Sequence, residues 1–157
     1  MNADALFRRH NQNGDCPTCQ VATVLLETQK TEWAEIQRND PETRVIYDKL
    51  KSGQTKPTKV EMAGCSWESL CLWSAWPRLS IHEEAMYYQY GENYGLRMIV
   101  PQSKVQYVLE KLHSELGHAG QHKMDHAVSQ RFWWPQQRPD VVNFCNRCTE
   151  CIRALPK

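Results

Sequence analysis

Apolar and polar positions follow two different periods along this chain. Between residues 79 and 90, apolar side chains alternate around the acidic turn Glu83-Glu84, and a further apolar stretch ends at Pro101. This alternation is typical of two or three short antiparallel strands. From residue 103 onward, apolar positions recur at the three- and four-residue spacing of one helix face. The pattern therefore predicts an α+β chain, with a small antiparallel sheet and flanking helices followed by a helical region.

Helices are also expected before the strands, at residues 31–53 and from Ser66 to Pro77. Asp40–Glu42 has the order of an N-cap, a first-turn proline and an acidic first-turn residue. Ser66 can cap the next helix, and Pro77 stops it. The residues between these helices, 54–60, are expected to form a linker. The apolar face of residues 31–53 is thin, so this segment needs another surface on which to dock.

The final region, residues 101–157, is expected to form three helices. Gly117 can end the first of them in the left-handed conformation. Few aliphatic side chains serve these helices, and a domain this small usually needs a metal ion or another cross-link. The expected helices span residues 103–116, 121–132 and 138 onward, and the third carries Cys148 on its last turn and Cys151 one turn further along.

Two histidines and two cysteines in this region form an N2S2 set. His113 and His118 are separated by four residues, and Cys148 and Cys151 by two. Imidazole nitrogen and thiolate sulfur are the donors that a structural Zn²⁺ ion prefers. We therefore expect one zinc ion to close residues 101–157 into a small domain. Because all four protein positions are filled, no position remains for an activated water, and metal catalysis is not expected.

Spacing alone leaves other N2S2 combinations open. Cys145 and Cys148 also form a Cys-x-x-Cys pair, and His122 and His126 also have the spacing of a chelating helical pair. The simpler interpretation is that both of these histidines lie on the surface and that Cys145 belongs to the core.

Composition and charge narrow the class of protein. The 157 residues are 41% hydrophobic and 24% charged, which is ordinary for a folded soluble chain, and the net charge is only +1. From Pro101 onward, however, 8 Lys and Arg accompany 5 Asp and Glu. No apolar run approaches the ~18 residues of a membrane span, and no signal-peptide pattern opens the chain. Seven cysteines without a secretory signal favour metal binding in an intracellular protein, although Cys16 and Cys19 lack a histidine pair and receive no function.

Four motifs lie along the final region. They are Leu112-His-Ser-Glu-Leu-Gly-His-Ala-Gly-Gln-His-Lys123, Phe132-Trp-Trp-Pro135, Asp140-Val141 and Cys148-Thr-Glu-Cys151. Together they resemble the His-His-Cys-Cys N-terminal domain of integrases, in the form found in gypsy-class LTR retrotransposons. The resemblance implies that His113, His118, Cys148 and Cys151 are the zinc ligands. Met124 replaces a threonine of the family pattern, a change that we expect on the helix surface.

The resemblance extends upstream in a looser form. Leu72-Trp-Ser-Ala-Trp76 looks like part of the extension that precedes this domain, and Asn2-Ala-Asp-Ala-Leu-Phe-Arg8 resembles the end of the polyprotein's RNase H domain. The implied organisation is an RNase H remnant and linker at residues 1–26, an integrase N-terminal extension at 27–100 and the zinc-binding domain at 101–157.

The resemblance also implies a function. In this family the zinc domain supports integrase self-association and engagement of the element's DNA ends, which places it in the nucleus. The acidic catalytic triad would follow Lys157, so the chain itself is not expected to be an enzyme. The excess of basic residues after Pro101, and not the resemblance, suggests that Lys123, Arg131 and Arg138 contact DNA phosphates. The alternative is a domesticated host protein that uses the same zinc fold as an adaptor for protein partners or DNA.

Overall fold

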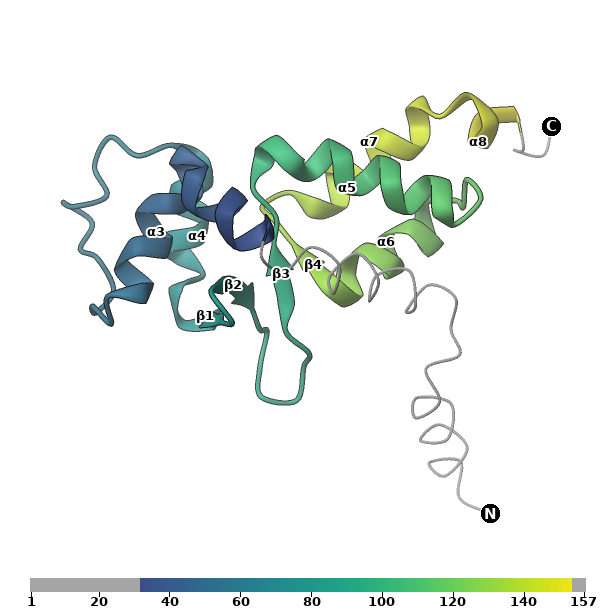
Figure 1. Ribbon diagram of the computed structural model, residues 1–157. Coiled ribbons are helices and arrows are strands. Elements are labelled where there is room, and N and C mark those ends of the chain that lie inside the picture. Colours follow the sequence, from purple (N-terminus) through teal and green to yellow (C-terminus); the bar gives the residue numbers. More distant parts are fainter. Residues whose placement is uncertain (1–31, 154–157) are drawn as a thin grey trace, which may run out of the picture.

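The computed structural model describes residues 32–153, in which a small sheet has helices on both sides. Its elements are a helix at residues 32–39, α3 (Pro41–Lys51), α4 (Trp67–Ser74), the 3-10 turn η1 (Trp76–Arg78), β1 (Leu79–His82), β2 (Ala85–Tyr88), β3 (Arg97–Ile99), α5 (Gln102–Glu115), α6 (Gln121–Arg131), β4 (Phe132–Trp133), α7 (Gln137–Arg147) and α8 (Thr149–Arg153). Figure 1 shows α3 and α4 on one side of the sheet and α5, α6 and α7 on the other. The expected α+β class is confirmed.

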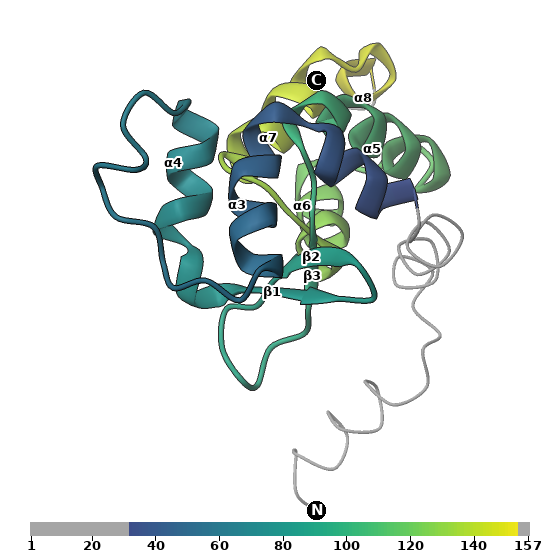
Figure 2. The same ribbon diagram turned by 60° about the vertical axis from the view of Figure 1, so that its left-hand side comes forward.

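The β1–β2 hairpin forms where the alternating pattern predicts it. Glu83 and Glu84 connect the strands with φ values of 48° and 69°, which is the left-handed geometry that suits a tight two-residue turn. The antiparallel register runs from Leu79 opposite Tyr88 to His82 opposite Ala85. Figure 2 shows this hairpin at the end of α3. β3 pairs antiparallel with β2, so three strands agree with the expectation.

The fourth strand was not expected. The sequence predicts a helix that continues to Phe132, but α6 ends at Arg131. Phe132 is its C-cap and has the backbone geometry of a strand. Phe132 and Trp133 then pair in parallel with Met98 and Ile99 of β3, and the Val100 N–H donates to the Trp133 carbonyl over 2.9 Å. The sheet is therefore mixed and has the order β1-β2-β3-β4.

The aromatic residues at positions 132–134, in β4 and directly after it, divide the apolar core into two layers. Phe132 and Trp134 are almost fully buried in one layer, with side chains of α5, α6 and α7. Trp133 points to the other layer and stacks on Tyr88 with ring centroids 4.5 Å apart. The first layer also contains Trp33 from the helix at residues 32–39. The upstream helix therefore packs on the same core as the C-terminal helices.

Gln37 is a fully buried polar residue at the point where β2 and β3 separate. The antiparallel register would place Met86 opposite Ile99. Instead, the Gln37 amide nitrogen donates to the Met86 carbonyl (3.0 Å) and the Ile99 carbonyl (2.8 Å), and its oxygen accepts from the Met86 N–H (2.7 Å). Because buried backbone groups need partners, the side chain replaces the missing part of the ladder.

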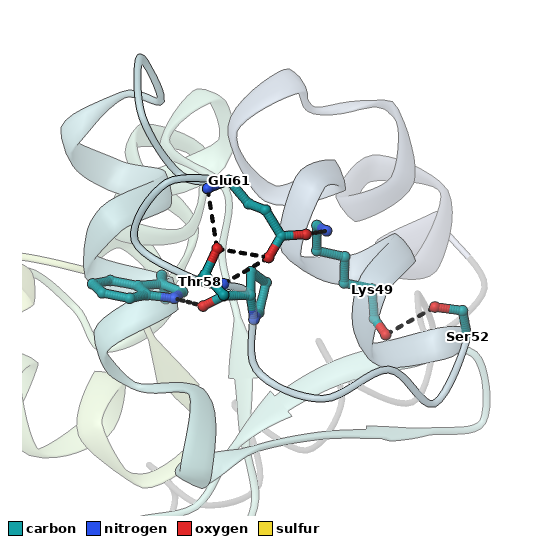
Figure 3. Close-up of polar contacts among 6 residues, drawn as sticks. Lys49, Ser52, Thr58 and Glu61 are labelled. Carbon is teal, nitrogen blue, oxygen red and sulfur yellow. Dashed lines mark hydrogen bonds and ion pairs between the residues drawn. The ribbon is translucent and has the colours of Figure 1, made fainter.

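The connection between α3 and α4 is ordered by polar contacts. Thr58 and Glu61 cap each other reciprocally, and the Lys49 ammonium lies 3.3 Å from the Glu61 carboxylate (Figure 3). The Trp73 indole N–H donates to the Pro57 carbonyl over 2.7 Å. These contacts accompany the burial of Met62 in the second core layer. The predicted linker is thus a structured loop.

The helix caps predicted at Asp40 and Ser66 are present, whereas α5 begins at Gln102, one residue before the expected start, and has Pro101 as its N-cap. The Asp40 carboxylate accepts from the Thr43 N–H over 2.9 Å, and Ser66 accepts from the Ser69 N–H over 3.2 Å. The structure corrects one expectation, because Met124 is fully buried in the core and does not lie on the helix surface. Its apolar side chain contributes to the first core layer.

Replacing Gln37 with leucine should destabilise the chain. Gln37→Leu leaves the Met86 N–H and the two carbonyls without their buried partner, and we expect a loss of about 2–4 kcal/mol in the free energy of unfolding. Urea unfolding of the zinc-loaded protein, followed by circular dichroism, measures this loss. The control is Gln106→Leu, because Gln106 is exposed on α5. Equal stability of the two variants would contradict the bridging role of Gln37.

Candidate metal centre

The end of α5 brings two histidines together. Gly117 has a φ of 66° and follows the C-cap Leu116. The His118 N–H donates to the His113 carbonyl over 2.9 Å, and the Gly117 N–H donates to the Ser114 carbonyl. These bonds form a Schellman motif, which turns the chain back over the last helical turn. His113 on that turn and His118 just past it were predicted, and their rings lie with centroids 4.8 Å apart.

The two cysteines lie at a break between helices. Cys148 was expected on the last turn of the third helix, but it is the C-cap of α7 and has a ψ of 115°. The next helix, α8, begins at Thr149 and carries Cys151 in its first turns. The backbone N–H of Cys151 hydrogen-bonds to the Cys148 sulfur. The break matters because it turns both sulfur atoms toward the end of α5.

The side chains of His113, Cys148 and Cys151 converge, and His118 lies beside them in contact with Cys148. The Cys151 Sγ lies 3.4 Å from Nε2 of His113, and the Cys148 Sγ lies 3.4 Å from Nδ1 of His118. Donor atoms of His113, Cys148 and Cys151 all lie within 4.8 Å of one another. In a tetrahedral site with bonds of about 2.0–2.3 Å, the donors are separated by about 3.3–3.8 Å. The structure therefore groups three of the four predicted donors around one point, and the two histidine–cysteine distances of 3.4 Å fall within the range for one small cation.

The two histidines are held in different ways. His113 is 3% exposed, and its ring meets Phe144 edge-on with centroids 5.2 Å apart. Its Nδ1 is buried and has no hydrogen-bond partner, so the polar contact of this ring is directed toward Cys151. His118 is exposed, and its Nε2 lies 3.2 Å from the Glu150 carboxylate. Sequence reasoning missed Glu150, although its place between the two cysteines is a signal that could have identified it.

The thiol groups differ in their affinity for a proton. The pKa of Cys148 is lowered to about 6, first by the Cys151 N–H and then by the two histidines. Burial raises the pKa of Cys151 to about 11, and the neighbouring Cys148 adds to this effect. The pKa of His118 is raised, chiefly by its contact with the Cys148 sulfur. Without a cation the cluster holds one thiolate, whereas a bound divalent ion deprotonates the second thiol as well.

The other donors suggested by spacing do not belong to this cluster. Cys145 is 4% exposed and belongs to the apolar core, as expected. His122 and His126 are exposed on α6, where His126 contacts Gln130. Among residues 32–153, all cysteines are free thiols. Cys16 and Cys19 lie outside the described residues.

The three basic residues predicted to contact DNA are placed along α6 and α7. Lys123 and Arg138 are exposed near the starts of these helices. Arg131 ends α6, is partly buried and donates to the Gln130 carbonyl over 3.4 Å. None of the three contributes to the His and Cys cluster.

The helical bundle and its N2S2 donor set define a structural zinc-binding domain. The clustered donors of His113, Cys148 and Cys151 fit one Zn²⁺ ion, with His118 beside them as the fourth predicted ligand, since borderline-soft zinc takes imidazole and thiolate ligands in tetrahedral sites. Residues 100–157 match the family model of the integrase zinc binding domain. The chain is also similar to the Pro-Pol polyprotein of Simian foamy virus type 3 (strain LK3), with 33% identity over 58 residues, 37% of this chain. That match spans only 5% of the length of the viral polyprotein.

Single cysteine substitutions should distinguish the zinc ligand Cys148 from Cys145, which is not a ligand. We expect one zinc ion per wild-type chain and its loss in Cys148→Ser, because a serine hydroxyl is a poor zinc donor at neutral pH. Cys145→Ser should keep the zinc and lose about 1–2 kcal/mol of stability, since it places a hydroxyl in the core. Elemental analysis of the purified full chains measures the content. Zinc lost from Cys145→Ser but kept by Cys148→Ser would reverse the assignment.

Proposed function

We propose that this chain provides the structural zinc module of an integrase, with His113, His118, Cys148 and Cys151 as the ligands of one Zn²⁺ ion. The clustering of His113, Cys148 and Cys151, with His118 in contact with Cys148, carries the proposal. The match of residues 100–157 to the integrase zinc binding domain supports it. Zinc binding contributes apparent folding free energies of about 10–16 kcal/mol in small finger peptides, which is enough to decide whether such a bundle folds.

The role assigned to the module is structural. Four protein donors complete a tetrahedral site and leave no coordination position for a water molecule. Activation of a nucleophile at this ion would require one ligand to leave. The module would therefore support integrase self-association and engagement of DNA ends, while strand-transfer chemistry belongs to another part of the polyprotein.

The proposed origin is a gypsy-class LTR retrotransposon. It rests on the motifs between Leu112 and Cys151 and on the upstream resemblance. The RNase H remnant that the sequence predicts at residues 1–26 lies outside the described residues and stays a prediction. An integrase origin would place the protein in the nucleus. Within residues 32–153, none of the helices combines the length and the apolarity needed to cross a bilayer.

A second candidate function is that of an adaptor for protein partners. Trp67 is 50% exposed and Leu70 is 37% exposed, and both lie on one face of α4. Exposed apolar residues of this size are found where proteins bind one another. Capture of protein partners without affinity for DNA would favour this function over the first.

DNA binding should depend on salt and on the basic residues of α6 and α7. We expect wild-type affinity for a DNA duplex to fall as salt rises, and Lys123→Ala/Arg138→Ala to reduce the slope of log K against log[salt] by about 2. Fluorescence anisotropy across a salt series measures both quantities.

A matched control removes the same charge elsewhere. Lys59 and Arg44 are exposed in the loop after α3 and on α3 itself, and Lys59→Ala/Arg44→Ala should leave the slope near the wild-type value. Affinity that does not change with salt, or an equal effect of the two double variants, would refute these phosphate contacts.

A further inference from the structure

The imidazole of His118 has polar contacts at both of its nitrogens. Nδ1 lies 3.4 Å from the Cys148 Sγ, inside the cluster, and Nε2 lies 3.2 Å from the Glu150 carboxylate, outside it. Glu150 stands between the two cysteines, in the first turn of α8. The short segment that carries both thiols therefore also carries a carboxylate against the opposite side of a histidine ring.

We propose that Glu150 is a positioning residue for the metal centre, which accepts the Nε2–H of His118 and holds Nδ1 toward the ion. This inference rests on the proposed zinc site. An imidazole N–H bound to a carboxylate fixes the tautomer in which the other nitrogen has a free lone pair, and it also raises the basicity of that nitrogen.

His113 and His118 differ in whether their rings need a hydrogen-bond partner to fix their orientation. His113 is buried and held by packing against Phe144, so its orientation is fixed without a hydrogen bond at Nδ1. The side chain of His118 is 40% exposed, and its residue follows Gly117 in a loop with a φ of 58°. Surrounding side chains do not enclose this ring, and a carboxylate at Nε2 can supply the missing restraint.

The expected loss of zinc affinity depends on how exposed the contact between His118 and Glu150 is. Loss of an outer-shell partner typically weakens metal affinity 10–100-fold. The Glu150 side chain is 63% exposed, and solvent weakens such a contact. We therefore expect Glu150→Ala to weaken zinc binding by about tenfold, at the lower end of that range. Glu150→Gln should have an intermediate affinity, because its amide oxygen still accepts the Nε2–H.

The control must remove the same charge near the site without touching His118. Glu115 lies at the end of α5, pairs with Lys111 and makes an ordinary exposed ion pair. Glu115→Ala should change zinc affinity by less than about twofold, because surface pairs contribute little. The full chains, loaded with Zn²⁺, are titrated against a chromophoric chelator to obtain the affinities.

A second measurement detects the hydrogen bond itself. Long-range ¹H–¹⁵N spectra of the zinc-loaded wild type should show a protected Nε2–H on His118, which exchanges faster in Glu150→Ala and remains protected in Glu115→Ala. A variant that merely lost stability would not change this single proton selectively.

The outcomes separate this inference from the proposed function. A wild-type chain that binds no zinc would overturn both. Zinc bound equally well by wild type and Glu150→Ala, or equal weakening by Glu115→Ala, would overturn only the role of Glu150. If Glu150→Ala fails to fold, Glu150→Gln provides the test instead. A zinc affinity of Glu150→Gln and an exchange rate of its His118 Nε2–H that both equal those of Glu115→Ala would count against the inference.

Discussion

The parallel pairing of β3 with β4 is the constraint on which the C-terminal half of the structure depends. β3 leads through Pro101 into α5, and β4 leads through Pro135 into α7. Two adjacent parallel strands therefore direct two helices away from the same edge of the sheet, as Figure 1 shows. α5 and α7 have 14 and 11 residues, so at about 1.5 Å per residue they reach similar distances from the strands. His113 and Cys148 stand at their far ends, which is why donors distant in sequence meet.

Apolar packing and the metal site hold opposite ends of this bundle. Near the sheet, Phe132, Trp134 and Val105 are buried in a shared core with the upstream helix. At the far end, Leu116 is only partly buried and His118 is exposed. A small domain gains little from packing at such an end, and a metal–ligand set closes it without further apolar residues. The metal centre therefore lies at the end of the bundle that the apolar core does not close.

Features with a local cause could be predicted from the sequence. The caps at Asp40 and Ser66, the hairpin turn and the end of α5 at Gly117 each depend on a few neighbouring residues. β4 could not be predicted, since two residues have no measurable period and their pairing depends on a strand more than thirty positions earlier. The bridge of Gln37 to β2 and β3 was missed for the same reason, because a glutamine in a helix pattern gives no sign of its distant partners.

The candidate site was predictable in composition but not in geometry. Donor type and spacing limited the candidates to histidine and cysteine pairs in this region, because structural zinc favours imidazole and thiolate, and the family resemblance implied which four residues are the ligands. The break of the helix at Cys148 was missed, since the sequence there has no glycine or proline to mark it. In a continuous helix, side chains advance by about 100° per residue, and Cys145, Cys148 and Cys151 could not all face one point. The break assigns Cys145 to the core and leaves the other two for the metal. Local helix geometry therefore resolves the choice among cysteines that spacing left open.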